Sequence, residues 1–125
     1  MNARERSRAH LAKACEFLES AETNLTAHRW NAAAADAVVC GINAKDGICL
    51  SLTGTTRKSD NHAAALAELR AAGRTGADVE PTLRRLLNLK TRAQYQTDTI
   101  THQQAQRAVE WAGRLCVAAR SVVVS

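Results

Sequence analysis

Residues 30–52, WNAAAADAVVCGINAKDGICLSL, place small or apolar side chains around nearly the whole circumference of a helix. A helix that is apolar all round belongs in the middle of a bundle, against several neighbours or against a second subunit. Gly41 and Gly47 each cost about 1 kcal/mol relative to alanine inside a helix. We therefore expect neighbouring helices to approach this one closely and to compensate for that cost.

Asp46 stands four residues after Ile42 and three before Cys49, so it shares their face of the predicted central helix. A carboxylate on such a face is costly to bury alone and needs a cationic or hydrogen-bonding partner. Two interpretations stay open for it: a paired aspartate between helices, and a carboxylate that takes part in ligand binding.

The composition of the whole chain also favours helices over strands. The chain has 125 residues, about one domain's worth, and it contains 25 alanines, six glycines and a single proline. Alanine is the best helix former because it loses no side-chain entropy, whereas the strand-favouring β-branched residues are comparatively sparse. We expect residues 1–125 to form one all-α domain.

Apolar periodicity extends this prediction on both sides of the central helix. An amphipathic helix is expected over residues 3–27, and Gly54 is a natural C-terminal stop for the central helix. A third helix is expected over residues 61–72, with Ser59 or Asp60 accepting from its free amides.

The glycines that follow predict where the third helix ends and the fourth begins. Gly73 and Gly76 are expected to end the third helix, and Asp78 to cap the fourth. The first turn of that fourth helix would tolerate Pro81, because early helical amides have no partner.

The last helix has the most specific start signal in the chain. Thr101 and Gln104 form a T-x-x-Q capping box, and a regular apolar stripe continues to about residue 122. Five helices joined by short loops predict an antiparallel bundle. Alanine-rich stripes bury little area per residue, so a homodimer that covers Trp30 or Trp111 would add to the core.

The charge balance permits a phosphate-bearing partner. Seventeen Lys and Arg against twelve Asp and Glu give a formal net charge of +5. Two basic clusters stand out, and both are interpreted first as solvated helix faces. They are Arg4, Arg6, Arg8 and Lys13 in the first, and Arg84, Arg85, Lys90 and Arg92 in the second.

The cysteines predict packing rather than metal binding. Cys15, Cys40, Cys49 and Cys116 show no C-x-x-C spacing, and each lies in an apolar helical pattern. No metal site and no cofactor are expected from this arrangement. The start of the chain has no apolar signal core and no run long enough to cross a bilayer, so we expect a cytoplasmic protein without membrane contact.

Standard catalytic motifs are not found, and the most polar segment between helices becomes the candidate site. It runs over residues 89–98 and offers Lys90, Arg92 and Tyr95 to an anion, with Asp46 as a further ligand-binding candidate.

These segments together resemble the HEPN superfamily (higher eukaryotes and prokaryotes nucleotide-binding). The resemblance lies in RWNA at 29–32, SDNH at 59–62, and KTRAQY at 90–95 before an alanine-rich last helix. The last of these is similar to the family's R-x-x-A-D-Y pattern. The resemblance implies a small all-α bundle that is commonly a dimer.

The resemblance also implies a ribonuclease chemistry from which this chain departs. Many HEPN domains are metal-independent ribonucleases of toxin systems, with an Arg, a polar residue and a His about one turn later. Here Lys90 stands in place of the Arg, and no His follows Arg92 until His102, ten residues on and inside the capping box. The candidate catalytic residues are therefore Arg92, Tyr95 and His102, and a tyrosine is a poor acid or base near neutral pH.

Three functions remain open from the sequence. The first is a non-catalytic HEPN-like domain that binds a nucleotide, an RNA phosphate or a partner such as a nucleotidyltransferase or an antitoxin. The second is a metal-independent endoribonuclease acting as a homodimer, and the third is a purely structural helical interaction module.

Overall fold

Five α-helices make up the part of the chain that the structure describes. The computed structural model covers residues 1–57, 61–95 and 99–123, apart from the side chains of residues 92–95. The helices are α1 (Ala3–Thr26), α2 (Trp30–Thr53), α3 (His62–Arg70), α4 (Gly73–Tyr95) and α5 (His102–Val122). The described residues contain no strand, so the predicted all-α class is confirmed.

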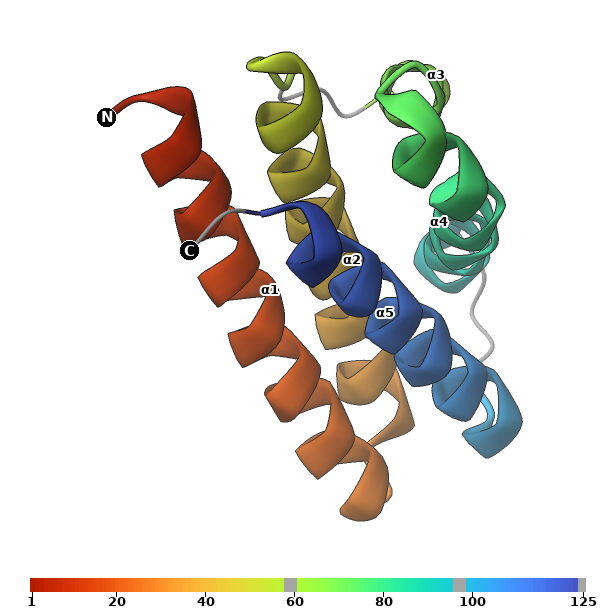
Figure 1. Ribbon diagram of the computed structural model, residues 1–125. Helices are drawn as coiled ribbons and strands as arrows, with labels where there is room; N and C mark the ends of the chain where they lie inside the picture. Colours follow the sequence, from red (N-terminus) through yellow and green to blue (C-terminus); the bar gives the residue numbers. More distant parts are fainter. Residues whose placement is uncertain (58–60, 96–98, 124–125) are drawn as a thin grey trace.

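The four long helices run alternately in opposite directions, and the short α3 lies beside α4 (Figure 1). α2 contacts each of the other four helices, which confirms its predicted place in the middle of an antiparallel bundle. In the described part of the chain, no helix combines the length and the apolar character that crossing a bilayer requires.

Small side chains let α2 approach its neighbours closely. A Cβ atom added at Gly41 would collide with Cδ2 of Leu86 and lie 3.2 Å from Cδ1 of Leu115. A Cβ at Gly47 would lie 3.4 Å from the backbone oxygen of Ser7. The expectation that close helix packing compensates for these two glycines is therefore confirmed.

Local signals at several helix ends act as the sequence predicts. Gly54 ends α2 in the left-handed conformation, with φ 81° and its N–H donating to the Leu50 carbonyl. At α5 the Thr101 hydroxyl accepts from the Gln104 N–H at 3.1 Å, while the Gln104 side chain accepts from the Thr101 N–H at 2.9 Å. The capping box is thus complete.

The junction between α3 and α4 differs from the prediction. Asn61 caps α3 by accepting from the Ala64 N–H at 3.1 Å, while Ser59 and Asp60 lie outside the described residues. α3 ends at Arg70 and α4 begins at Gly73, so the prediction that a fourth helix starts at Asp78 is wrong.

Backbone geometry explains this difference. Gly73 has φ +74° and makes the sharp bend between the helices, because a glycine adopts this conformation without steric cost. Gly76 lies inside α4, where an added Cβ would collide with the carbonyl oxygen of Leu69. Its missing side chain lets the first turn of α4 pack against the end of α3. Pro81 consequently lies well inside the helix, where it removes one backbone hydrogen bond.

Replacing two helical glycines by alanine should have opposite effects on stability. Gly76→Ala should lower the free energy of unfolding by about 2 kcal/mol or more, because the new methyl group meets backbone that cannot move aside. Gly113→Ala should raise it by up to about 1 kcal/mol, since an added Cβ there has no neighbouring atom within 4 Å. Urea unfolding of both variants measures the difference, and equal stabilities would contradict the proposed role of Gly76.

Candidate functional site

A buried lysine organises the polar contacts at one end of the central helix. Lys45 of α2 is only 2% exposed. Its Nζ donates to Asp46 Oδ1 at 3.2 Å, to Thr56 Oγ1 at 3.0 Å and to the Glu68 carboxylate. Because Thr56 lies in the α2–α3 connection and Glu68 in α3, the lysine ties both to α2.

The charges in this cluster stabilise one another. Burial alone would lower the pKa of Lys45, but the hydrogen bond to Glu68 and the charge of Asp46 outweigh it, so the pKa of Lys45 is raised. Burial alone would raise the pKa of Glu68, but hydrogen bonds from Lys45 and from the Arg57 N–H lower the pKa of that carboxyl. Each group therefore keeps its charge in the fold, and removing one would leave the others buried without compensation.

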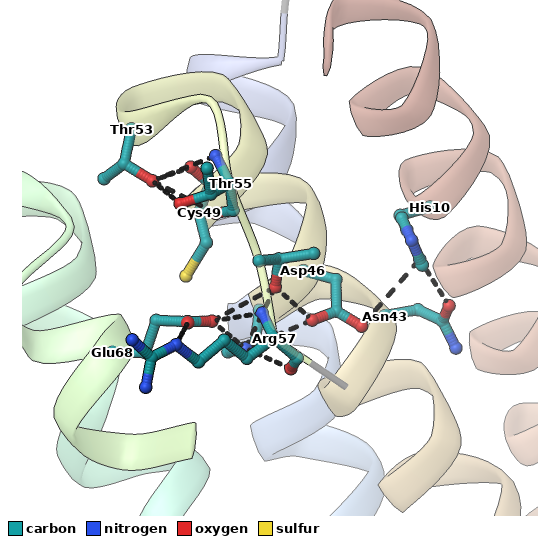
Figure 2. A network of polar contacts seen from close by, with 10 residues as sticks. His10, Asn43, Asp46, Cys49, Thr53, Thr55, Arg57 and Glu68 are labelled. Atoms are coloured by element: carbon teal, nitrogen blue, oxygen red, sulfur yellow. Dashed lines mark hydrogen bonds and ion pairs between the residues drawn. The ribbon is translucent and has the colours of Figure 1, made fainter. Parts of the chain in front are cut away.

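A histidine from α1 meets the same region of α2 (Figure 2). Nδ1 of His10 lies 2.9 Å from Asn43 Oδ1 and 3.9 Å from Asp46 Oδ2. Asn43 donates its own amide group to the Val39 carbonyl at 2.9 Å, which directs Oδ1 toward the imidazole. A carbonyl oxygen only accepts, so Nδ1 donates the proton of this hydrogen bond and Nε2 takes no part in it.

These groups line a cleft of about 380 Å³ between α1, α2, α3 and α4, which we call the basic cleft. It is lined by His10, Lys13, Ile42, Asn43, Lys45, Asp46, Arg57, His62, Ala65, Leu83, Leu87 and Lys90. Four of these side chains are cationic and only one is a carboxylate, so the cleft favours an anion.

Two of the four cations are available to a ligand. Lys45 is neutralised by Asp46 and Glu68, and Arg57 Nε lies 3.9 Å from Glu68 Oε2. Among the residues that the structure describes, neither Lys13 nor Lys90 has an acidic partner within ion-pairing distance. One lysine comes from each of the two basic clusters of the sequence, and the fold brings both to one cleft.

A second, apolar hollow of about 440 Å³ adjoins the basic cleft, and Ile42 and Lys90 line both. It follows α2 and is otherwise lined by Asn31, Ala34, Ala35, Val38, Val39, Leu89 and Ile100. A ligand with an anionic end and a flat apolar end would therefore find both environments side by side.

The structure brings together two of the residues predicted to bind a ligand. Asp46 and Lys90 both line the basic cleft. The side chains of Arg92 and Tyr95 lie outside the described residues, so their predicted roles stay predictions. Asp46 is a paired, buried carboxylate, as one of its two interpretations required.

His102 lies elsewhere, at the start of α5. Its ring stacks on Trp30 with centroids 4.5 Å apart, and His28 stacks on the same indole at 5.0 Å. His28 lies in the connection between α1 and α2 with φ 60°, an uncommon conformation for a residue other than glycine. The fold thus assembles a three-ring stack from one tryptophan and two histidines that come from the α1–α2 connection and the starts of α2 and α5.

Sequence reasoning missed His10, Lys13 and Lys45 as parts of one site. Nothing in the local sequence signals that His10 of α1 meets Asn43, because the contact depends on how two helices pack. Lys45 carried a usable signal, since a lysine in a helix that is apolar all round must find a carboxylate.

Metal binding is not supported by the described residues, among which no three His, Cys, Asp or Glu side chains are arranged to hold a metal ion. Cys40, Cys49 and Cys116 are buried, as predicted, and Cys15 is half-buried.

The HEPN domain model matches residues 7–122, nearly the whole chain. The chain therefore belongs to the HEPN domain family, and its all-α fold agrees with this membership. No curated protein and no solved structure matches it.

Glu68 should make the stability of the protein depend on pH. Its pKa is lowered in the folded state, so its contribution is complete above the unfolded-state value of about 4.3 and disappears as the pH falls through the folded-state pKa. Glu68→Gln should cost about 1–3 kcal/mol of unfolding free energy at pH 7, and the difference from the wild type should shrink below about pH 4.

Unfolding by urea at a series of pH values measures this difference. Glu80 also has a lowered pKa, through Arg84 and Arg70 acting against its burial, but it is present in both proteins and cancels in the comparison. Glu110→Gln, at an exposed position of α5, is the matched control. A pH-independent difference between Glu68→Gln and the wild type would contradict the assignment.

Proposed function

We propose that the basic cleft binds the phosphate groups of a nucleotide or of RNA, without metal. The observation that carries the proposal is the convergence of Lys13 and Lys90, which have no acidic partner among the described residues, on one cavity. Membership of the HEPN family supports a ligand of this class.

The cations of the basic cleft have different roles, which follow from their contacts. Lys45 is a structural cation, because its charge is already balanced by two carboxylates. Lys13 and Lys90 would bind phosphate oxygens through charge-assisted hydrogen bonds. The adjoining apolar hollow would take the base.

We also propose the assembly that the resemblance to the HEPN superfamily implies. We expect a homodimer, and we expect a nucleotidyltransferase or an antitoxin as its partner in a toxin–antitoxin pair. Both are consistent with the family and with a domain that binds rather than reacts. Light scattering and co-expression with the neighbouring reading frame address these two points separately.

Removing the two available lysines should weaken binding of ATP. Each charge-assisted hydrogen bond is worth about 1.5 kcal/mol, which is roughly tenfold in Kd, so Lys13→Ala with Lys90→Ala should weaken binding about 100-fold. Isothermal titration at two salt concentrations measures the effect, and the wild type should bind more weakly at the higher salt.

The matched control removes two other exposed cations. Arg107→Ala with Arg114→Ala changes the net charge equally, but both positions lie on α5 and outside the basic cleft. Binding that this control weakens as much as the cleft variant would show a general effect of charge and would contradict a specific site.

A second candidate function, metal-independent RNA cleavage, is favoured by the orientation of His10. The hydrogen bond from Nδ1 to Asn43 leaves Nε2 able to accept a proton, as a general base requires. His10 would take the proton of a 2′-hydroxyl, the 2′-oxygen would attack phosphorus, and the 5′-oxygen would leave. His62, which lines the same cleft, would protonate the leaving oxygen.

Cleavage of a short RNA in excess chelator tests this second function. The wild type should produce 2′,3′-cyclic phosphate ends, and His10→Ala or His62→Ala should reduce the rate about 100-fold or more, the usual contribution of general acid–base catalysis. His102→Ala is the control, because that ring lies in the aromatic stack. No cleavage by the wild type, or cleavage indifferent to His10→Ala, would eliminate this function and leave the binding proposal standing.

A further inference from the structure

Three cysteines from three helices lie together in the bundle, away from the basic cleft. Cys40 of α2 and Cys116 of α5 are fully buried, and their Sγ atoms are 3.2 Å apart. A disulfide bond needs about 2.05 Å between sulfurs, so an approach of roughly 1 Å would join them. Both thiols are free in the structure.

Cys15 of α1 connects this buried pair with the surface. Its thiol is half-buried, and with Cys40 and Arg120 it helps to lower the pKa of the Cys116 thiol. The exposed Arg120 donates from its guanidinium to Cys15 Sγ at 3.2 Å. A cationic donor beside a partly accessible sulfur would stabilise the negative charge on that sulfur when it reacts.

We propose that Cys15, Cys116 and Cys40 form a thiol relay that reacts with hydroperoxides and closes a Cys40–Cys116 disulfide between α2 and α5. In this relay the half-buried sulfur of Cys15 reacts with the oxidant, and the buried pair Cys40 and Cys116 ends as the disulfide. No residue of the relay lines the basic cleft, so this site is independent of the proposed function.

The chemistry balances with a hydroperoxide as the only co-reactant. The Cys15 thiolate attacks the terminal peroxide oxygen, the O–O bond breaks, and the alkoxide leaves and takes up a proton as the alcohol. Cys15 becomes a sulfenic acid. The Cys116 thiolate then attacks the Cys15 sulfur and expels hydroxide, which is protonated to water.

A thiol–disulfide exchange completes the relay. Cys40 gives up its proton as its sulfur attacks the Cys116 sulfur, and Cys15 leaves as a thiolate and takes up a proton. One hydroperoxide and two thiols thus give one disulfide, one alcohol and one water, and Cys15 is restored for a further reaction.

The two buried thiols shift each other's pKa in opposite directions. The hydrogen bond to Cys116, together with burial, raises the pKa of Cys40, which therefore keeps its proton and donates it toward Cys116. The same hydrogen bond and the charge of Arg120 lower the pKa of Cys116 despite its burial.

Disulfide formation would link the central helix to the last one. Residues 40 and 116 are far apart in sequence, so the bond would close a long loop and restrict the unfolded chain. We expect the oxidised protein to melt about 10 °C higher than the reduced protein.

The experiment treats the reduced full chain with one equivalent of hydrogen peroxide. The titratable thiols of the unfolded chain should fall from four to two. Peptide mapping by mass spectrometry should find Cys40 linked to Cys116 within one chain, and dithiothreitol should reverse the change. Sulfinic acid at Cys15 without a disulfide, or links only between chains, would overturn the proposal.

Single substitutions separate the steps of the relay. Cys15→Ala should slow disulfide formation at least tenfold, and Cys40→Ala should stop it at a Cys15–Cys116 bond. Cys49→Ala is the matched control, because Cys49 is a buried thiol on α2, like Cys40, but is not one of the three cysteines of the relay. Burial raises the pKa of Cys49 to about 11. A rate that Cys15→Ala leaves unchanged would show that the oxidant does not enter through Cys15.

Discussion

The structure depends on neutralising one positive charge inside the bundle. Lys45 is held in the most crowded helix, where an ammonium group without partners would be very costly. Asp46 comes from the same helix, but Glu68 comes from α3, so the balance requires that α3 be folded and docked. The α2–α3 connection is bound in turn, because Thr56 and the Arg57 backbone contact the same carboxylates. The need to balance the charge of Lys45 thus holds the α2–α3 connection and α3 in place, although both are otherwise weakly attached. Together they form one wall of the basic cleft.

The structure also depends on the close approach of its helices, which small residues allow. Gly41 and the alanines of α2 bring its axis near to those of α4 and α5. This packing leaves little room for large side chains in the centre, so much of the chemistry moves to the ends and edges of the helices. The basic cleft lies at one such edge, while Cys40 and Cys116 bring their sulfurs within 3.2 Å of each other between α2 and α5.

The sequence predicted the fold better than the site, for a physical reason. Helix periodicity and caps such as Gly54 and Thr101 are local, and the structure confirms them. The start of α4 was missed because Gly76 acts through a contact with Leu69, which no local rule anticipates. For the site, Asp46 could be named as a carboxylate on an apolar helix face, and Lys90 from its place in the most polar segment between helices. The meeting of His10 with Asn43, like that of Cys40 with Cys116, depends on the register between helices far apart in sequence.

The weak attachment of α3 makes the side of the basic cleft that α3 forms less rigid than the rest. In the described part of the chain this nine-residue helix contacts only α2 and α4, and it is too short to be stable alone. Its attachment relies on two buried leucines and on ionic contacts at Glu68 and Arg70. Its amides should therefore exchange with solvent deuterium sooner than those of α2, through local opening that leaves the other helices intact. A ligand that seals the cleft would slow this exchange, and part of its binding energy would be spent on holding α3 still.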